Sequence, residues 1–387
     1  MGAQKAYVAS VGFTQIGDHW DKSLLDLAVD ASRGALKGLG GRKVDQVIVG
    51  NMFSAVGAGQ EHLGALVAGA LGMHGVPAFK VEAACASGGS AFNVGYKLVK
   101  SGAIGSALVV GVEKMRDLEP EEASQALAMA ESAEYTQFVG ATFAALNGLL
   151  ARLYMEREDV TRDELSAMPV LDHANAVTAA HAQFRKAITP EVVSRSAMIA
   201  DPLRLFDCAP VGDGAAAALI VNDDALSWSK GGRAEILGGR VATNEFSVYE
   251  REDMLDFKAS KLAFKGAMAD AGLSPGKLSL VEVHDAFSVV GALSLEAMGF
   301  SKRGEGSKDA KAGKYSRGGD IPINTFGGLK ARGHPVGATG MYQIAEAYLQ
   351  LTGQAGKNQV EGAEYAATQN IGGVDSTSAV HVFGRAS

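Results

Sequence analysis

The chain contains 387 residues, of which 47% are apolar and 20% charged, a balance typical of globular rather than disordered proteins. Lysine and arginine number 36 against 43 acidic residues, so the net charge is −7, and no basic run stands out. A nucleic-acid-binding surface needs clustered positive charge. The absence of a basic run therefore argues against a nucleic-acid-binding protein. The two cysteines, Cys85 and Cys208, are too few for a disulfide framework or a four-cysteine zinc site.

The sequence carries no targeting or membrane signal of the common kinds. The first residues, MGAQKAYVASVGFTQIG, lack the basic segment and apolar core of a secretory signal. No run of about 18 uninterrupted apolar residues is present, so we expect no membrane-spanning helix. The last residues, GRAS, differ from a peroxisomal Ser-Lys-Leu address. We therefore expect a cytoplasmic location.

Helical and strand-like segments alternate along the first third of the chain. Residues 23–39 place Leu25, Ala28 and Val29 on one helical face, which predicts an amphipathic helix. The runs 45–54 and 106–115 are rich in β-branched residues and predict two buried strands. Strands that alternate with helices of this length favour a mostly parallel sheet covered by helices.

The second half of the chain repeats the first. The helix, turn and strand predicted for 260–288 match the stretch that ends at Ser54. A duplicated α/β unit is the simplest explanation, and such units commonly pack about a pseudo-twofold axis. The further correspondences pair 84–99 with 333–349, both small-residue turns that open onto a helix, and 106–111 with 377–383.

Residues 115–200 separate the two repeats and are rich in Glu, Ala, Met and Arg. Helical spacing is clearest in 141–158, so we predict a mostly helical insertion that supplies a lid or a binding wall. The N-terminal half then covers residues 1–230, including this insertion, and the C-terminal half covers 231–387.

Cys85 is the first candidate for chemistry. It lies in VEAACASGGSAF, between a strand-like run and a predicted helix. A thiol at a helix N-terminus faces unpaired N–H groups and the positive end of the dipole, which favours thiolate and can hold an oxyanion. The alternative is a small buried hydrophobe, the commoner environment of a cysteine.

Two histidines complete the candidate set. His334 lies between Gly and Pro in NTFGGLKARGHPVGATG, where no periodic apolar face explains it. An imidazole that accepts a thiol proton is the usual partner of an activated cysteine. His284, in VEVHDAF, follows a predicted strand at its C-terminal end, where open α/β sheets place their ligands. A buried histidine bonded to Asp285 or to backbone is the alternative for His284.

Cys208 and the absence of nucleotide-binding and metal-binding motifs add no further catalytic candidates. Cys208, in LFDCAPVGDGAAAALIV, has no histidine or cationic side chain near it in sequence, which favours a structural role. The sequence contains no P-loop, no HExxH motif and no metal-spaced His/Cys pair, so we expect no metal site.

Five segments, in this order, resemble the thiolase family over essentially the whole chain: ACASGGSAF, FDCAPVGDGAAAALIVND, VEVHDAFS, NTFGGLKARGHPVGATG and ATQNIGGVDSTSAVHVF. HDAF replaces the Asn-Glu-Ala-Phe of ordinary thiolases, which is similar to the sterol-carrier-type and archaeal-type branch. The resemblance implies a duplicated, five-layered αβαβα fold. It also implies coenzyme A and acyl-CoA as substrates, no permanently bound cofactor, and a homodimer or a dimer of dimers.

The resemblance also implies roles for individual residues. Cys85 corresponds to the family's nucleophile and His334 to its activating base. His284 replaces the Asn of the oxyanion hole that holds the oxygen of the attacking thioester. The backbone N–H groups of Cys85 and Gly372 correspond to the second oxyanion hole.

The second catalytic cysteine of the family is missing. Ordinary thiolases carry it two residues before the glycine that matches Gly372, where this chain has Asn370. Sterol-carrier-type members commonly carry it in His-Asp-Cys-Phe, where this chain has Ala286. The archaeal-type members that form acetoacetyl-CoA are most similar, and they often work with a separate small protein that has an OB fold and a zinc ribbon. Such a partner is therefore expected.

Three functions are consistent with these residues. The first is a thiolase that makes or cleaves acetoacetyl-CoA or another 3-oxoacyl-CoA through an acyl-enzyme on Cys85. The second is a decarboxylating ketosynthase-like enzyme, which also uses one cysteine and two histidines. The third is a non-catalytic relative that binds acyl-CoA or lipid, which the joint presence of Cys85, His284 and His334 argues against. The GHPVGATG loop favours the thiolase.

Overall fold

A computed structural model describes residues 4–37, 39, 41–225 and 232–386. Its centre is a nine-stranded sheet in the order β3-β2-β4-β7-β1-β8-β11-β10-β9. The predicted boundary between residues 230 and 231 lies outside the described residues. The strands are β1 (Ala6–Phe13), β2 (Gln46–Gly50), β3 (Ala78–Val81), β4 (Ser106–Glu113), β7 (Gly214–Asn222), β8 (Ala234–Thr243), β9 (Leu280–Glu282), β10 (Tyr365–Gly372) and β11 (Thr377–Arg385).

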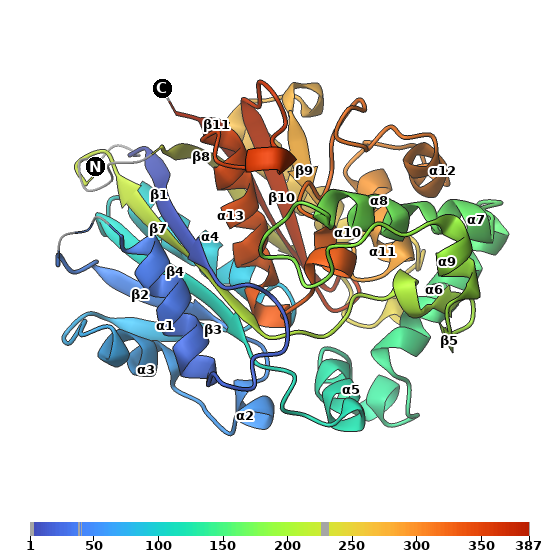
Figure 1. Ribbon diagram of the computed structural model, residues 1–387, viewed down its shortest axis with the longest axis horizontal. Helices are drawn as coiled ribbons and strands as arrows, with labels where there is room; N and C mark the ends of the chain where they lie inside the picture. Colours follow the sequence, from blue (N-terminus) through green and yellow to red (C-terminus); the bar gives the residue numbers. More distant parts are fainter. Residues whose placement is uncertain (1–3, 38, 40, 226–231, 387) are drawn as a thin grey trace.

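Helices cover the outer faces of the sheet, and two further helices lie between its N-terminal and C-terminal halves (Figure 1). The helix α1 packs outside β7, β4 and β1, and α10 packs outside β8 and β11. Between the two halves, α4 packs on β4 and β2, α13 packs on β10 and β7, and the two helices contact each other. These five layers are α1 (Leu24–Ala35) with α3 (Leu63–Ala70), the N-terminal strands, α4 (Ser87–Lys100) with α13 (Thr339–Leu351), the C-terminal strands, and α10 (Lys258–Ala271).

The strand order confirms the duplication and corrects one of its correspondences. The order β2-β4-β7-β1 on one side is repeated as β9-β10-β11-β8 on the other, and the halves meet where Val8 of β1 pairs with Ala234 of β8. The segment 106–111 therefore corresponds to β10, and the expected match to 377–383 is wrong. Both candidate partners are short apolar strands, and composition alone does not separate them.

The expectation of a mostly parallel sheet is also wrong. Among the strands of this sheet that the structure describes, the parallel pairs are β3 with β2, β2 with β4, and β10 with β9. A hairpin turn over 373–376 forces β11 to run antiparallel to β10. In the N-terminal half, the long insertion returns the chain to the sheet as β7, antiparallel to β4.

The insertion is mostly helical, as predicted, and packs on the C-terminal half. Its α6 contacts α11. Its α8 contacts α12 and the turn 328–332, which is part of residues 324–340, called the GHPVGATG loop from here on. Its elements are α5 (Pro120–Ala128), α6 (Phe143–Arg157), α7 (Arg162–Leu165), α8 (Ala167–Ala176) and α9 (Pro190–Arg195), followed by β5 (Met198–Ala200) paired with β6 (Leu203–Arg204). The remaining short helices are α2 (Ser54–Gly57), α11 (Ser288–Ala297) and α12 (Gly306–Lys311).

Local sequence explains the main helix starts. Ser23 caps α1 and forms a capping box with Asp26, and Thr142 caps α6 through the backbone N–H of Ala145.

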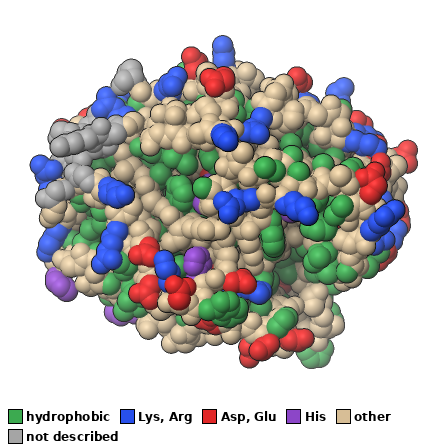
Figure 2. Space-filling model, viewed as in Figure 1, with side chains coloured by type: hydrophobic (Ala, Val, Ile, Leu, Met, Phe, Trp, Pro, Cys, Tyr) green, Lys and Arg blue, Asp and Glu red, His purple; other side chains and the backbone are tan. Residues whose placement is uncertain are grey.

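On the face shown in Figure 2, basic side chains are scattered among acidic and apolar ones. Within the described part of the chain, none of the helices has both the length and the apolar character needed to cross a membrane.

Candidate active site

Cys85 lies in a tight turn between β3 and α4. Ala84 before it adopts a left-handed backbone with φ of 49°. The N–H groups of Ala86 and Ser87 are tied back to the turn, at 3.0 Å from the carbonyl oxygens of residues 83 and 84. The thiol side chain is only 3% exposed and packs against apolar neighbours that include Phe53 and Val336. Cys85 therefore lies just before the helix start, as the sequence predicts, but in a closed apolar environment.

Both candidate histidines are buried and face each other. His284 follows β9 by two residues, and His334 precedes the short turn Val336–Ala338 that leads into α13. Their ring centroids are 5.2 Å apart, with an interplanar angle of 82°. The C-terminal half of the duplicated fold therefore brings the carboxyl end of the strand β9 and the start of the helix α13 to one point.

Asn370, near the end of β10, connects the cysteine to this pair. Its Nδ2 lies 3.0 Å from the carbonyl oxygen of Cys85 and 3.3 Å from Nδ1 of His284. Two residues later, a Cβ on Gly372 would stand 2.2 Å from the carbonyl oxygen of Ala83. Only glycine allows the strand end to approach the cysteine turn this closely. The structure thus brings together Cys85, His284, His334 and Gly372.

Burial controls the charge of the thiol and of its partner. Desolvation, with a smaller contribution from Glu113, raises the pKa of Cys85 to about 12. Desolvation and the neighbouring His284 hold the pKa of His334 well below its usual value. The resting pair is therefore a neutral thiol and a neutral imidazole. The expectation that the helix start favours a resting thiolate is wrong, because desolvation outweighs the helix dipole here.

Thr339 fixes the orientation of His334. Its hydroxyl donates to the carbonyl oxygen of Pro335 at 3.2 Å and lies 2.7 Å from Nδ1 of His334. With the hydroxyl proton used on the carbonyl, the hydroxyl oxygen accepts the hydrogen of Nδ1. Nε2 of His334 then carries a free lone pair, which is the state required of a proton acceptor.

His284 is also neutral. Burial is the main cause that lowers its pKa to about 3; Asp285 opposes this shift, and the cations Arg332 and Lys330 contribute to it. Its backbone N–H donates to Oε1 of Gln369 at 3.0 Å. The predicted alternative of a bond from the ring to Asp285 is not what the structure contains, because the ring contacts Asn370 instead.

A buried ion pair beneath His284 escaped the sequence reasoning. Lys330 donates from Nζ to the side chain and to the carbonyl oxygen of Asp285, both at 2.6 Å, and lies 3.4 Å from Asp172. All three side chains are fully buried. Lys330 holds the HDAF segment against the GHPVGATG loop. A lysine inside a glycine-rich loop was the available signal.

The buried carboxyl group of Glu113 also holds the GHPVGATG loop in place, on the side of Cys85. Oε2 of Glu113, at the end of β4, accepts from the backbone N–H groups of Met52 at 2.8 Å and Gly337 at 3.1 Å. Its Oε1 accepts from Asn51 at 2.7 Å. Desolvation raises the pKa of Glu113 to about 7. This residue ties the GHPVGATG loop to the N-terminal strands, and sequence reasoning missed it as well.

Cys208 lies against the HDAF segment rather than in the histidine pair. The backbone N–H of Ala209 donates to the carbonyl oxygen of Ala286 at 2.7 Å. The thiol of Cys208 lies 3.5 Å from the carbonyl oxygen of Arg204, and burial raises its pKa to about 12. Its position next to Phe287 makes it part of a cavity wall.

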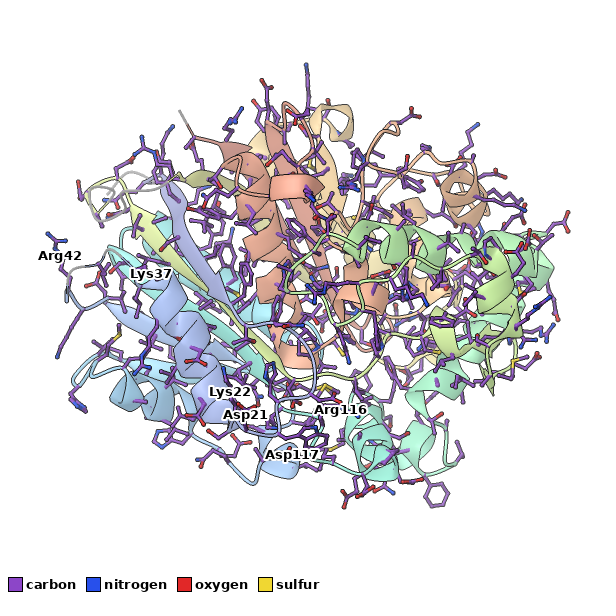
Figure 3. All side chains as sticks on the ribbon, in the orientation of Figure 1. Asp21, Lys22, Lys37, Arg42, Arg116 and Asp117 are labelled. Carbon is purple, nitrogen blue, oxygen red and sulfur yellow. The ribbon has the colours of Figure 1, made fainter. Side chains whose placement is uncertain are left out.

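That cavity, of about 450 Å³, opens beside the candidate site. Figure 3 labels Arg116 and Asp117, two of its polar lining residues, near α5. Four apolar side chains line the cavity and also belong to the cluster around Cys85: Met115, Leu118, Leu127 and Val211. The cavity therefore has a continuous apolar wall that leads to the thiol.

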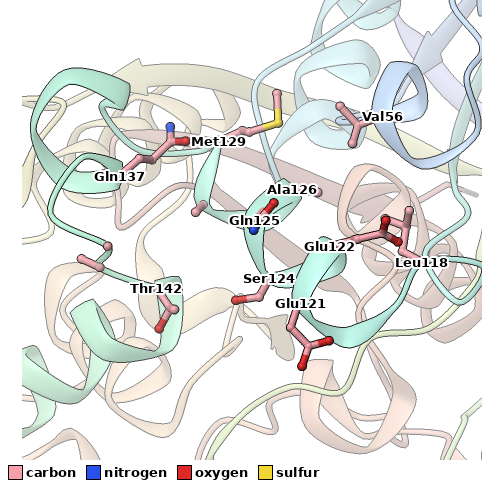
Figure 4. A pocket seen from close by; sticks show the side chains of 13 residues that line it. Val56, Leu118, Glu121, Glu122, Ser124, Gln125, Ala126, Met129, Gln137 and Thr142 are labelled. Atoms are coloured by element: carbon pink, nitrogen blue, oxygen red, sulfur yellow. The ribbon is translucent and has the colours of Figure 1, made fainter.

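A larger cavity, about 840 Å³, runs along the other side of α5 and is shown in Figure 4. Its wall includes Glu121, Glu122 and Thr142, but none of the three candidate catalytic side chains. Volume alone therefore does not identify the site, whereas convergence of reactive groups does.

Comparison with known proteins defines the class to which this fold and site belong. The sequence matches the family profile described as "Thiolase, N-terminal domain" over residues 6–224 and the profile "Thiolase C-terminal domain-like" over residues 240–385. The chain therefore belongs to the thiolase family, as predicted, and is an acyltransferase.

Individual relatives refine that class. The chain is 41% identical to an acetyl-CoA acetyltransferase of Methanothermobacter thermautotrophicus, over 98% of this chain and 99% of the relative. It is 36% identical to an acetyl-CoA acetyltransferase of Methanocaldococcus jannaschii, over 97% and 98%. Human sterol carrier protein 2 is 29% identical over 95% of this chain and 70% of its own length. These relatives confirm the predicted archaeal-type and sterol-carrier-type branch.

Solved structures confirm the predicted fold. The "Ltp2-ChsH2(DUF35) aldolase" matches with a TM-score of 0.86 at 22% identity, over 99% of this chain and 98% of that chain. The human mitochondrial 3-ketoacyl-CoA thiolase in complex with CoA matches with a TM-score of 0.74 at 20% identity, over the same shares.

Proposed function

We propose that Cys85 is the nucleophile of this thiolase and that acetoacetyl-CoA is a substrate. The observation that carries the proposal is that Asn370 contacts both the backbone carbonyl of Cys85 and the ring of His284, which in turn faces the ring of His334. Full-length similarity to two acetyl-CoA acetyltransferases supports the acetyl donor.

In the acylation step, Nε2 of His334 takes the proton of the Cys85 thiol as sulfur attacks the carbonyl carbon of acyl-CoA. The tetrahedral oxyanion is held by the backbone N–H groups of Cys85 and Gly372. The carbon–sulfur bond to coenzyme A then breaks, and the imidazolium returns its proton to the departing thiolate. The products are acyl-Cys85, free coenzyme A and neutral His334.

In the condensation step, acetyl-CoA loses an α-proton to Nε2 of His334, and Nε2–H of His284 stabilises the enolate oxygen. The α-carbon attacks the acyl carbonyl, the bond to the Cys85 sulfur breaks, and that thiolate recovers the proton from His334. The base is His334 because Asn370 and Ala286, at the family's two thiol positions, have no titratable group. Cleavage is the reverse sequence.

The cavity beside the site supports coenzyme A as a substrate that enters and leaves. Its 450 Å³ volume is within the usual range of small-molecule pockets, and it combines an apolar wall with polar residues such as Arg116 and Ser124. We assign the pantetheine arm of acyl-CoA to this cavity.

A substrate panel tests the function. The purified chain is incubated with free coenzyme A and a series of 3-oxoacyl-CoA thioesters, and thioester loss is followed. We expect cleavage of acetoacetyl-CoA to two acetyl-CoA molecules. Absence of cleavage for every 3-oxoacyl-CoA, with or without added partner protein, would contradict the proposal.

The second candidate is a decarboxylating ketosynthase, which the missing second thiol favours. Loss of carbon dioxide from a malonyl thioester generates the carbanion without a base, so Asn370 in place of cysteine is harmless in that reaction. Malonyl-CoA and acetyl-CoA are compared as donors to acyl-Cys85. Condensation with malonyl-CoA alone identifies this second function.

We also propose a homodimer. The strand β3 is an edge of the nine-stranded sheet, and unpaired edge groups are suited to strand pairing between copies. The apolar side chain of Phe79, on β3 itself, is 39% exposed. Light scattering after gel filtration is expected to give twice the 40.0 kDa chain mass or a multiple of that dimer.

A separate OB-fold and zinc-ribbon protein is the proposed partner. The solved neighbour named "Ltp2-ChsH2(DUF35) aldolase", whose name joins two components, supports such a partner. Affinity purification from the native cell is expected to recover a small zinc-containing protein. Full activity of the purified chain alone, with no such protein recovered, would contradict a required partner.

A further inference from the structure

Asn370 stands where the family's second catalytic cysteine is expected, and it is enclosed by two glycines. A Cβ on Gly89 would lie 2.9 Å from its Oδ1, and a Cβ on Gly340 would lie 2.3 Å from the same atom. These glycines belong to the first turns of α4 and α13, one from each half of the fold. The amide of Asn370 therefore fills a space that the duplicated helices leave between them.

Two backbone groups of opposite polarity fix the orientation of this amide. The N–H of Gly89 can only donate, and it lies 3.1 Å from Oδ1. The carbonyl oxygen of Cys85 can only accept, and it lies 3.0 Å from Nδ2. Exchanging the oxygen and nitrogen would place two acceptors together and two donors together, so the amide has one allowed orientation.

The second hydrogen of Nδ2 decides the protonation of His284. Nδ1 of that ring lies 3.3 Å from Nδ2 and receives this hydrogen. A hydrogen on Nδ1 would face another hydrogen, so Nδ1 carries the lone pair and the ring proton lies on Nε2. The ring is a neutral donor because burial prevents it from taking a second proton.

We propose that Asn370 is a positioning residue that holds His284 as the Nε2–H tautomer, so that this ring donates a hydrogen bond to the thioester oxygen and takes no proton from carbon. The role of that donated hydrogen bond rests on the proposed function. The tautomer itself is a property of the free chain.

The two histidines then have complementary Nε2 atoms. Nε2 of His284 bears a hydrogen, whereas Nε2 of His334 bears a lone pair because Thr339 accepts from its Nδ1. One ring stabilises the oxygen of the donor thioester and the other accepts the α-proton. Replacing the second thiol by an amide therefore assigns the proton-accepting task to His334.

The test is nitrogen NMR on the free, full-length chain labelled with [15N]histidine. The chain has 8 histidines, and His284 is assigned by loss of its signals in His284→Gln. We expect Nε2 of His284 to show the shift of a protonated ring nitrogen and Nδ1 that of an unprotonated one. A protonated Nδ1 in the wild-type chain overturns the proposal without any further variant.

The variant Asn370→Asp reverses the polarity of the contact. A carboxylate accepts from Gly89 and also from Nδ1–H, so we expect His284 to switch to the Nδ1–H tautomer. Condensation then falls about 10²–10³-fold, the scale for losing one oxyanion donor. An unchanged tautomer in a folded Asn370→Asp overturns the proposal.

Gln343→Ala is the matched control. Gln343 is a buried amide on α13 that donates to the carbonyl oxygen of Gln369 at 2.8 Å and contacts neither histidine ring. Its loss is expected to leave the His284 shifts unchanged, and an equal shift change would overturn the specific role of Asn370. Acylation of Cys85 is measured in parallel, and its absence beside an Nε2–H tautomer would count against the proposed function alone.

Discussion

Cys85 and His334 are both uncharged at rest, which sets how the thiol is expected to react. The thiolate is the reactive form, and burial raises the thiol pKa to about 12. Raising the pH therefore increases the thiolate fraction about tenfold per unit throughout the neutral and mildly alkaline range. In His334→Ala, where no imidazole accepts the thiol proton, the alkylation rate of Cys85 by iodoacetamide is expected to rise from pH 7 to pH 10 without a plateau. A plateau above about pH 9.5 would indicate an ordinary exposed thiol.

The two histidines are expected to separate kinetically. His334→Ala removes the acceptor of the thiol proton, so alkylation of Cys85 slows by about 10²-fold or more. His284→Ala leaves alkylation nearly intact and lowers condensation by about 10²–10³-fold. Iodoacetamide kinetics and a condensation assay on each variant test this division. Equal slowing of alkylation by both substitutions would contradict it.

Cys208 provides a test of the proton acceptor. Its thiol contacts the carbonyl oxygen of Arg204 and contributes to the cavity wall, so Cys208→Ala is expected to be nearly silent in catalysis. Solvent-deuterium exchange into the α-position of acetyl-CoA measures the step directly. The assignment of His334 as base is wrong if Cys208→Ala abolishes this exchange while acylation of Cys85 and the fold remain intact.

Sequence reasoning proposed the candidate catalytic residues and missed the residues that hold them in place. Cys85, His284 and His334 have reactive side chains in unusual local patterns, and the fold brings them together. Lys330 and Glu113 act through contacts with segments distant in sequence, at Asp285 and Met52, which only the tertiary structure reveals. The resting thiol was also mispredicted, because local sequence reveals the helix start but not the depth of burial.

Among the elements, the GHPVGATG loop is held by an ion pair whose loss is expected to be costly. Lys330→Met leaves the carboxylates of Asp285 and Asp172 buried without their cation, which costs about 3–5 kcal/mol of unfolding free energy. Denaturant unfolding measures this change. The control is Lys311→Met, which removes an exposed pair with Asp163 and is expected to change the unfolding free energy far less. Equal losses in the two variants would contradict a structural role for the buried pair.

The contact between α4 and α13 is equally specific. A Cβ on Gly340 would stand 2.4 Å from the backbone nitrogen of Gly89, so Gly340→Ala must displace one helix start. We expect a loss of about 1–3 kcal/mol or more and slower alkylation of Cys85. Gly69→Ala in α3, where a Cβ meets open space, is expected to be neutral or slightly stabilising. A neutral Gly340→Ala would show that the helices can separate without consequence.

The sequence predicted which segments form helices and strands better than it predicted which strands pair and in which direction. The helices, the buried strands and the duplication are present, because periodicity and local composition encode them. The direction of β7 and β11 depends on how the chain returns to the sheet, which no local pattern carries. For the same reason 106–111 was matched to β11 when its structural counterpart is β10.

For the whole molecule, the duplication explains why a single site forms. Each half contributes a small-residue turn before a central helix, yet the N-terminal turn carries Cys85 and the C-terminal one carries His334. Asn370 and His284 come from the C-terminal strand ends. The pseudo-symmetric frame therefore places different chemistry at equivalent positions, and the site lies where the two halves meet.

The central claim is that Cys85 carries the acyl group, and peptide mass spectrometry tests it most directly. The purified chain is incubated with acetyl-CoA in the absence of free coenzyme A, quenched in acid and digested, with Cys208→Ala and Cys85→Ala treated in parallel. We expect an acetyl group on the peptide that contains Cys85, in the wild type and in Cys208→Ala, and none in Cys85→Ala. An acetyl group on Cys208 in place of Cys85 would contradict the account.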